Sequence, residues 1–138
     1  MTLTATDINR LIHEGVPTSA FTGFLVERIE GQRVHCRNRY DPSQLRPGGT
    51  LSGPTLMGLA DAAMYAVVLA SMGPLEMAVT QHLNINFLRK PAPCDLLAVA
   101  EPLKVGRRSM ALEVRIYSEG DPAMVAHVTG SYALPHTA

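Results

Sequence analysis

The chain has 138 residues, and a single domain of that length can bury roughly two thirds of the surface that its unfolded chain exposes. Twelve basic and twelve acidic side chains give a formal net charge of zero. A neutral chain has no overall field that attracts nucleic acid or an anionic membrane, so we expect neither as a partner. Zero net charge also weakens repulsion between copies and favours a homo-oligomer.

The cysteine and histidine patterns indicate no metal site. Cys36 and Cys94 stand far apart and match no Cys-x-x-Cys or Cys/His spacing, so we interpret them as reduced thiols. The five histidines have no metal-ligand spacing either. Residues 1–15 mix charged and apolar side chains, unlike the apolar centre of a signal peptide. These features predict a cytoplasmic protein without a bound metal.

The first predicted element is a short helix that begins after Thr4, where Asp7 is placed to complete a capping box. Gly15 supplies its stop signal. Its apolar residues recur at helical spacing, at Ile8, Leu11 and Ile12. We treat residues 1–22 as an accessory helix with a lead-in, and residues 23–138 as the main domain.

The main domain is predicted to be an antiparallel sheet around one long helix. Residues 23–29 and 33–39 predict a hairpin, and residues 54–72 predict a helix bounded by Pro54 and by Gly73-Pro74. Four strands follow, separated by proline and glycine turns, at residues 77–88, 95–105, 108–118 and 123–134. This order predicts an α+β domain.

Residues 54–72 must also be tested as a membrane span, because they carry a single charge over nearly the ~20 residues that cross a bilayer. We reject that interpretation. Asp61 lies near the middle of the segment, and strand-like segments follow it, so a helix covered by a sheet explains the apolarity better.

Asp61 is the first candidate for chemistry. A lone carboxylate among apolar neighbours carries a desolvation cost, so it must find a partner or become harder to ionise. Such a group can act as a general base or as a nucleophile on an activated carbonyl. Asp61 could equally well hydrogen-bond a neighbouring loop or face solvent, and composition does not separate these alternatives.

A glycine-rich segment, residues 47–54, leads into the same helix. It brings backbone N–H groups to the helix N-terminus, where the dipole favours negative charge, so it can form an oxyanion hole. The segment matches neither GxGxxG nor a Walker loop, which argues against a nucleotide phosphate site. A plain glycine turn is the alternative.

The strand over residues 78–88 alternates polar and apolar side chains. Alternation places Thr80 on a polar face with His82, Asn84 and Asn86, with Gln81 breaking the opposite pattern. Thr80 could orient a water molecule, although a strand threonine is more often structural.

Basic residues gather after two of the predicted strands. They are Arg89 and Lys90 at the first site, and Lys104, Arg107 and Arg108 at the second. Such a group could hold the phosphates of a carrier such as coenzyme A. Solvated turn charges are the alternative interpretation.

Two segments carry a family resemblance. GTLSGPTLMGLADAA at residues 49–63 and AVTQHLNINFLR at residues 78–89 resemble the hot-dog-fold thioesterases of the phenylacetate-pathway (PaaI-like) type. The resemblance spans roughly residues 23–134. It implies a meandering antiparallel sheet wrapped around a central helix, and a homodimer or a dimer of dimers with active sites at the subunit interface.

The resemblance also implies roles for individual residues. The family's acidic nucleophile or general base corresponds to Asp61, its helix-start glycine to Gly53, and its water-orienting hydroxyl to Thr80. The family's histidine before that glycine is Ser52 here, and its asparagine six residues earlier is Arg46 in an ungapped alignment. We include Ser52 and Arg46 with Arg89, Arg107 and Arg108 as expected substrate-binding residues.

Three hypotheses follow from these residues. The first is an acyl-coenzyme A thioesterase that cleaves small to medium or aromatic acyl groups, with coenzyme A present only as part of the substrate. The second is a module that binds acyl-coenzyme A without cleaving it, which the changes at Arg46 and Ser52 would explain. A hydratase ranks last, because the sequence shows no aspartate-histidine pair of the expected kind.

Overall fold

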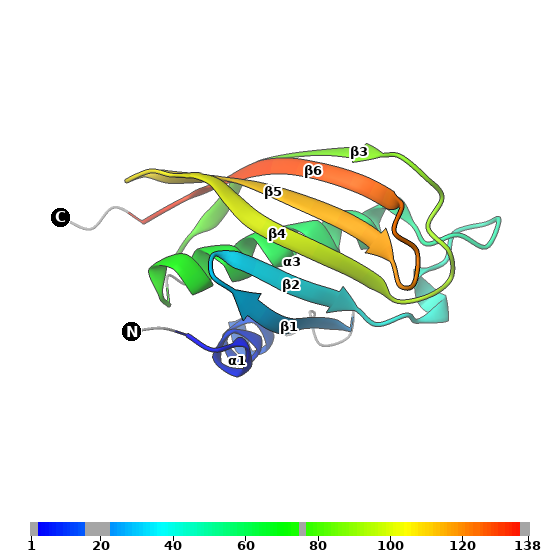
Figure 1. The fold of residues 1–138 in the computed structure, drawn as a ribbon, viewed down its shortest axis with the longest axis horizontal. Helices are drawn as coiled ribbons and strands as arrows, with labels where there is room; N and C mark the ends of the chain where they lie inside the picture. The colour runs from blue at the N-terminus through cyan, green and yellow to red at the C-terminus, as the bar shows by residue number, and fades with distance from the viewer. Residues whose placement is uncertain (1–2, 16–22, 75–76, 136–138) are drawn as a thin grey trace.

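The computed structural model describes residues 3–15, 23–74 and 77–135. Six strands form one antiparallel sheet in the order β1-β2-β4-β5-β6-β3, and helix α3 (Gly53–Met72) runs along one face of this sheet (Figure 1). The strands are β1 (Phe24–Glu30), β2 (Arg33–Asn38), β3 (Val79–Phe87), β4 (Leu96–Val105), β5 (Ser109–Ser118) and β6 (Met124–Ala133). Helix α1 (Ala5–Gly15) and the short 3-10 helix η1 (Pro42–Gln44) complete the fold. The predicted α+β class and hot-dog arrangement are confirmed.

The ends of α3 follow the signals in the sequence. Pro54 lies in its first turn, where a missing N–H costs nothing, and the helix begins one residue before the predicted start. Gly73 ends it with a φ of 85°, which glycine adopts without strain. Among the described residues α3 is the one helix long and apolar enough to cross a bilayer, yet half of the apolar stretch is buried inside this fold. It is the core helix.

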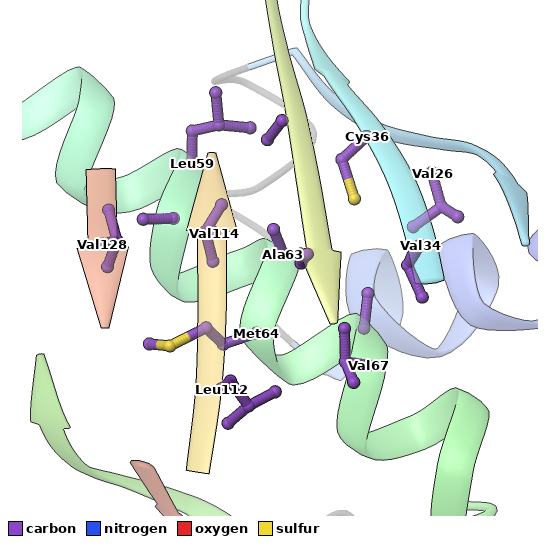
Figure 2. Close-up of a cluster of buried hydrophobic side chains, with 14 of the residues drawn as sticks. Val26, Val34, Cys36, Leu59, Ala63, Met64, Val67, Leu112, Val114 and Val128 are labelled. Carbon is purple, nitrogen blue, oxygen red and sulfur yellow. The ribbon is translucent and has the colours of Figure 1, made fainter. Parts of the chain in front are cut away.

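The hydrophobic core lies between α3 and the sheet (Figure 2). Helix and strands both contribute fully buried side chains, among them Val34, Ala63, Met64, Val67, Leu112, Val114 and Val128. Removal of this apolar surface from water is the main stabilising term of the fold. Cys36 is a free cysteine in the same core, and its burial raises the pKa of the thiol, which keeps it protonated.

Helix α1 begins with the predicted capping box. The Thr4 N–H donates to Asp7 Oδ2 (2.9 Å), and the Asp7 N–H donates to Thr4 Oγ1 (3.1 Å). Residues 16–22, which complete the predicted N-terminal segment, lie outside the described residues. The division between residues 22 and 23 therefore stays a prediction.

Helix α1 also closes one edge of the sheet. The Asn9 side chain donates to the Val26 carbonyl oxygen (2.8 Å) and accepts from the Val26 N–H (2.7 Å). The ring of His13 donates from Nε2 to the Phe24 carbonyl oxygen (2.9 Å). These bonds occupy backbone groups of β1 that face away from β2. The opposite edge, β3, has no such cover in the described part of the chain, so it is the edge open to another strand (Figure 1).

Strand β3 contains a β-bulge that changes the direction of Thr80. In the ladder with β6, Thr80 lies opposite Tyr132 and His82 lies opposite Ser131, so Gln81 is an extra residue. Strict alternation predicted that Thr80 and His82 share a face, and that prediction is wrong. The bulge turns Thr80 toward α3, where its hydroxyl meets the helix.

Gly130 allows α3 to approach the sheet closely. A Cβ atom on Gly130 would lie 2.6 Å from the His82 carbonyl oxygen and 2.7 Å from Met64 Sδ. Both distances are too short for any side chain at this position. Met64 is three residues after Asp61, so this contact sets the distance between the sheet and the helix segment that carries the Asp61 carboxylate.

We expect Gly130→Ala to lower the free energy of unfolding by about 1–3 kcal/mol, because the added methyl forces β3 or α3 to move. Ser131→Thr adds one methyl group at the next residue, whose half-buried side chain points to the opposite face. It should change the free energy of unfolding by less than about 0.5 kcal/mol. Urea unfolding of both variants measures the difference. Equal effects would show that α3 does not depend on the glycine.

Candidate functional site

The Asp61 carboxylate receives two hydrogen bonds from the sheet. Thr80 Oγ1 donates to Asp61 Oδ1 (2.6 Å), and the Tyr132 hydroxyl donates to the same oxygen (2.9 Å). Hydrogen bonds to a carboxylate are about twice as strong as neutral ones and restrict its orientation. The sequence left open whether Asp61 had a partner, and the structure supplies two. Asp61 Oδ2 has no hydrogen bond to any described residue.

Tyr132 is a buried member of this group. Its side chain is 4% exposed, and its ring stacks on Tyr65 with centroids 6.0 Å apart and ring planes 13° apart. Burial, and next the negative charge of Asp61, raise the pKa of the Tyr132 hydroxyl well above its usual range. The hydroxyl therefore stays protonated and remains a donor at any physiological pH.

A cavity of about 880 Å³ opens beside these hydroxyl groups. We call it the tyrosine cavity; it is lined by Leu11, Glu14, Gly15, Tyr65, Met77, Ala78, Val79, Thr80 and Tyr132. A largely apolar wall with a few convergent polar groups is typical of a small-molecule site. The cavity is large enough for an acyl group of modest size.

Gly53 stands at the N-terminus of α3, at the end of a loop that is held in place. Ser52, the N-cap residue, donates its N–H to the Gln44 carbonyl oxygen (2.9 Å), and Leu51 forms an isolated bridge with Leu45. No backbone hydrogen bond from the Gly53 N–H to a described residue is present. A free N–H at a helix N-terminus is suited to developing negative charge.

A second cavity, of about 450 Å³, lies at this helix start. We call it the Gly53 cavity; it is lined by Arg46, Thr50, Leu51, Gly53, Leu56, Phe87, Leu88, Arg89, Lys90 and Pro91. Three of the predicted residues, Gly53, Arg46 and Arg89, are thus brought together. Lys90 adds a third cation, so the cavity combines an unpaired amide with local positive charge.

The other predicted binding residues lie elsewhere. The Ser52 hydroxyl pairs with Thr55 Oγ1 (2.9 Å) and lines neither cavity. Arg107 and Arg108 are exposed in the turn between β4 and β5, which lies at the opposite end of the sheet from Gly53. Within one subunit they are not part of the Gly53 cavity.

Gly53 and Asp61 are also separated within one subunit. They are eight residues apart in α3, which places them about 12 Å apart along the helix axis. A single reacting carbonyl must lie about 3 Å from both its oxyanion donor and its attacking group. One chain therefore cannot present both groups to the same carbonyl.

Sequence reasoning missed Tyr132. Its hydroxyl meets a carboxylate 71 residues earlier in the chain, and spacing cannot reveal such a contact. One signal was available: β6 alternates buried and half-buried residues, and Tyr132 is a polar-tipped side chain at one of the buried positions. A buried tyrosine hydroxyl needs a hydrogen-bond partner.

The chain matches the family model of the thioesterase superfamily over residues 48–125. A candidate thioesterase from Silicibacter sp. TM1040 is 34% identical, with a TM-score of 0.86 over 96% of this chain and 92% of that one. The fold is also similar to thioesterase HI1161 of Haemophilus influenzae (19% identity, TM-score 0.85, 99% and 93% covered). A mutant of the phenylacetic acid degradation protein PaaI of Thermus thermophilus is 22% identical (TM-score 0.75, 86% and 99% covered).

No curated protein sequence is significantly similar to the chain. The family match covers more than half of the chain, and it includes both Gly53 and Asp61 together with Thr80. The resemblance seen in residues 49–63 and 78–89 is confirmed. The chain belongs to the thioesterase superfamily of hot-dog-fold thioester hydrolases.

Proposed function

We propose that this protein is an acyl-coenzyme A thioesterase that releases small to medium or aromatic acids. The observation that carries the proposal is the Asp61 carboxylate, which is held by the hydroxyl groups of Thr80 and Tyr132, two residues that line the tyrosine cavity. The cavity supplies an apolar place for the acyl group, and the carboxylate supplies the group that attacks or activates water.

Two chemical routes use the same residues. In one, Asp61 Oδ2 takes a proton from water while the water oxygen bonds to the thioester carbon. In the other, Asp61 attacks that carbon itself, and water then hydrolyses the resulting anhydride. Either way the C–S bond breaks, sulfur leaves as a thiolate that takes up a proton, and the Gly53 N–H stabilises the carbonyl oxygen as it becomes negative.

Thr80 takes part through its lone pairs. Its hydroxyl hydrogen is donated to Asp61 Oδ1 (2.6 Å), so its oxygen can only accept a hydrogen bond from water. A water that donates to Thr80 lies next to the carboxylate. This is how Thr80 would orient the water that the first route activates.

A two-fold dimer through β3 would bring the separated groups together. β3 is the open edge of the sheet, and it carries exposed apolar side chains, among them Val79 (58%) and Phe87 (53%). A symmetric antiparallel pair of β3 strands places the start of one strand beside the end of the other. Thr80 and Asp61 of one subunit then approach the partner's Phe87 and Gly53.

The basic residues fit the phosphates of coenzyme A. Arg46, Arg89 and Lys90 surround the Gly53 cavity, where the sulfur side of the thioester would leave. The same two-fold symmetry puts Arg107 and Arg108 at the end of the dimer that holds the partner's Gly53. A cytoplasmic location stays a prediction that is consistent with this substrate.

Thiol release from a panel of short, medium, long and aromatic acyl-coenzyme A thioesters tests the proposal. We expect turnover that is highest for acyl groups that the tyrosine cavity can hold. Coenzyme A without an acyl group is the control for inhibition by product.

The outcomes of this assay separate the two hypotheses. Thiol release with saturation kinetics supports the thioesterase. Saturable binding of an acyl-coenzyme A, measured by calorimetry, with no thiol release across the panel would instead support the non-catalytic binding module. No binding and no release would contradict both.

A further inference from the structure

The hydroxyl groups of Thr80 and Tyr132 converge on one oxygen of Asp61. They come from neighbouring strands, where the two residues lie directly opposite each other in the β3–β6 ladder. Both donate to Oδ1, and the Tyr132 hydroxyl also lies 3.2 Å from the Asp61 backbone carbonyl oxygen. Oδ2 keeps its lone pairs free of any described partner.

We propose that Tyr132 is a positioning residue that fixes the Asp61 carboxylate, so that Oδ2 is the oxygen that attacks or takes the proton. The inference rests on the proposed thioesterase function and assigns a role to a residue outside the predicted set. Two donors on Oδ1 hold the Asp61 carboxylate in one orientation about its Cβ–Cγ bond. A single donor on a half-buried aspartate would leave this rotation free.

The surroundings of Tyr132 are rigid enough for this role. It is a buried residue of β6, an inner strand paired on both sides, by β5 and by β3. Its ring stacks on Tyr65, one helical turn after Asp61, so the helix and the sheet both locate it. A phenol in such a place loses little further freedom when it donates a hydrogen bond.

Few charged groups surround the carboxylate among the described residues. β6 contributes Tyr132, α3 contributes Tyr65, and α1 contributes Glu14 at the wall of the tyrosine cavity. β3 contributes only the neutral Thr80, because the bulge turns His82 to the other face. Among the described residues, the Thr80 and Tyr132 hydroxyls are therefore the groups that hold the carboxylate.

Tyr132→Phe tests the role, because it removes the hydroxyl and keeps the stacked ring. Loss of one donor leaves Thr80 as the single described donor on Oδ1, so the carboxylate can rotate away from its reactive orientation. We expect kcat to fall about tenfold with KM nearly unchanged, because the orientation of the carboxylate affects the reaction and not the binding of substrate. A purely structural role would lower the melting temperature and leave kcat of the folded enzyme unchanged.

The matched control is Tyr117→Phe, the same change at a half-buried tyrosine of β5 that lines neither of the two cavities. It should leave both kcat and KM unchanged. The parent protein and Asp61→Ala are measured beside both variants. An unchanged kcat in Tyr132→Phe, with an active parent and an inactive Asp61→Ala, would overturn this inference alone. A parent that releases no thiol would overturn the proposed function and the inference with it.

Discussion

Asp61→Ala is expected to lower kcat/KM for thioester hydrolysis by about 10² to 10⁴, the usual contribution of a positioned acid or base. The substitution removes the carboxylate that accepts from the Thr80 and Tyr132 hydroxyls in the described part of the chain. Without it, the reaction loses the group that we propose as base or nucleophile. Thiol release at substrate concentrations well below KM measures the loss.

The variant must be shown to fold, because it leaves the buried Tyr132 hydroxyl with only the longer contact to the backbone carbonyl oxygen of residue 61 (3.2 Å). A hydrogen bond to a charged group contributes about 1.5–3 kcal/mol, so we expect a lower melting temperature and an unchanged circular dichroism spectrum. Asp121→Ala, at an exposed aspartate in the turn after β5, is the matched control and should keep full activity. A folded Asp61→Ala protein that still hydrolyses thioesters at the parent rate would refute the assigned role.

Local signals were sufficient to predict the two α-helices and the six strands of this fold, but not the short 3-10 helix η1. Pro54 and Gly73 fixed α3 to within one residue, because each has a backbone preference that acts at a helix end. The capping box of Thr4 and Asp7 fixed the start of α1 in the same way. These signals depend only on neighbours in the chain, so no tertiary information was needed.

The direction of Thr80 could not be predicted in the same way. A bulge inserts one residue into a ladder, and only the partner strand determines where that residue lies. Gln81 interrupts the apolar pattern of β3, and this was the visible trace of the bulge. The reversal that brings Thr80 to Asp61 depends on how β3 pairs with β6, which a single sequence does not contain.

The predicted cationic residues lie at two different ends of the subunit for a similar reason. Arg46 and Arg89 reach one cavity because the glycine-rich loop and the end of β3 meet at the start of α3. Arg107 and Arg108 are equally basic in sequence, yet the antiparallel sheet carries them to the far end of the same subunit. Topology, rather than residue type, decides which charges can serve one substrate.

Gly53→Pro is expected to reduce kcat by about 10² to 10³, because it removes the one backbone N–H assigned to the oxyanion. Two features favour the change: Ser52 is extended (φ −76°, ψ 153°), as a residue before proline should be, and the first helical position suits proline. Gly53→Ala is the matched control. It keeps the N–H, and its Cβ would lie 3.5 Å from the Phe87 ring, an ordinary contact.

A mixed dimer of one Gly53→Pro subunit and one Asp61→Ala subunit tests whether the active site is shared between subunits. If Asp61 of one subunit works with the partner's Gly53, a mixed dimer of the two variants has one site with both defects and one intact site. A one-to-one mixture, refolded together, contains half mixed dimers and should recover about one quarter of the parent activity. Two different affinity tags isolate the mixed dimers, which should then show about half of the parent activity. Isolated mixed dimers with no activity would show that each site is built from a single chain, and the 12 Å separation along α3 would have to be closed by movement within that chain.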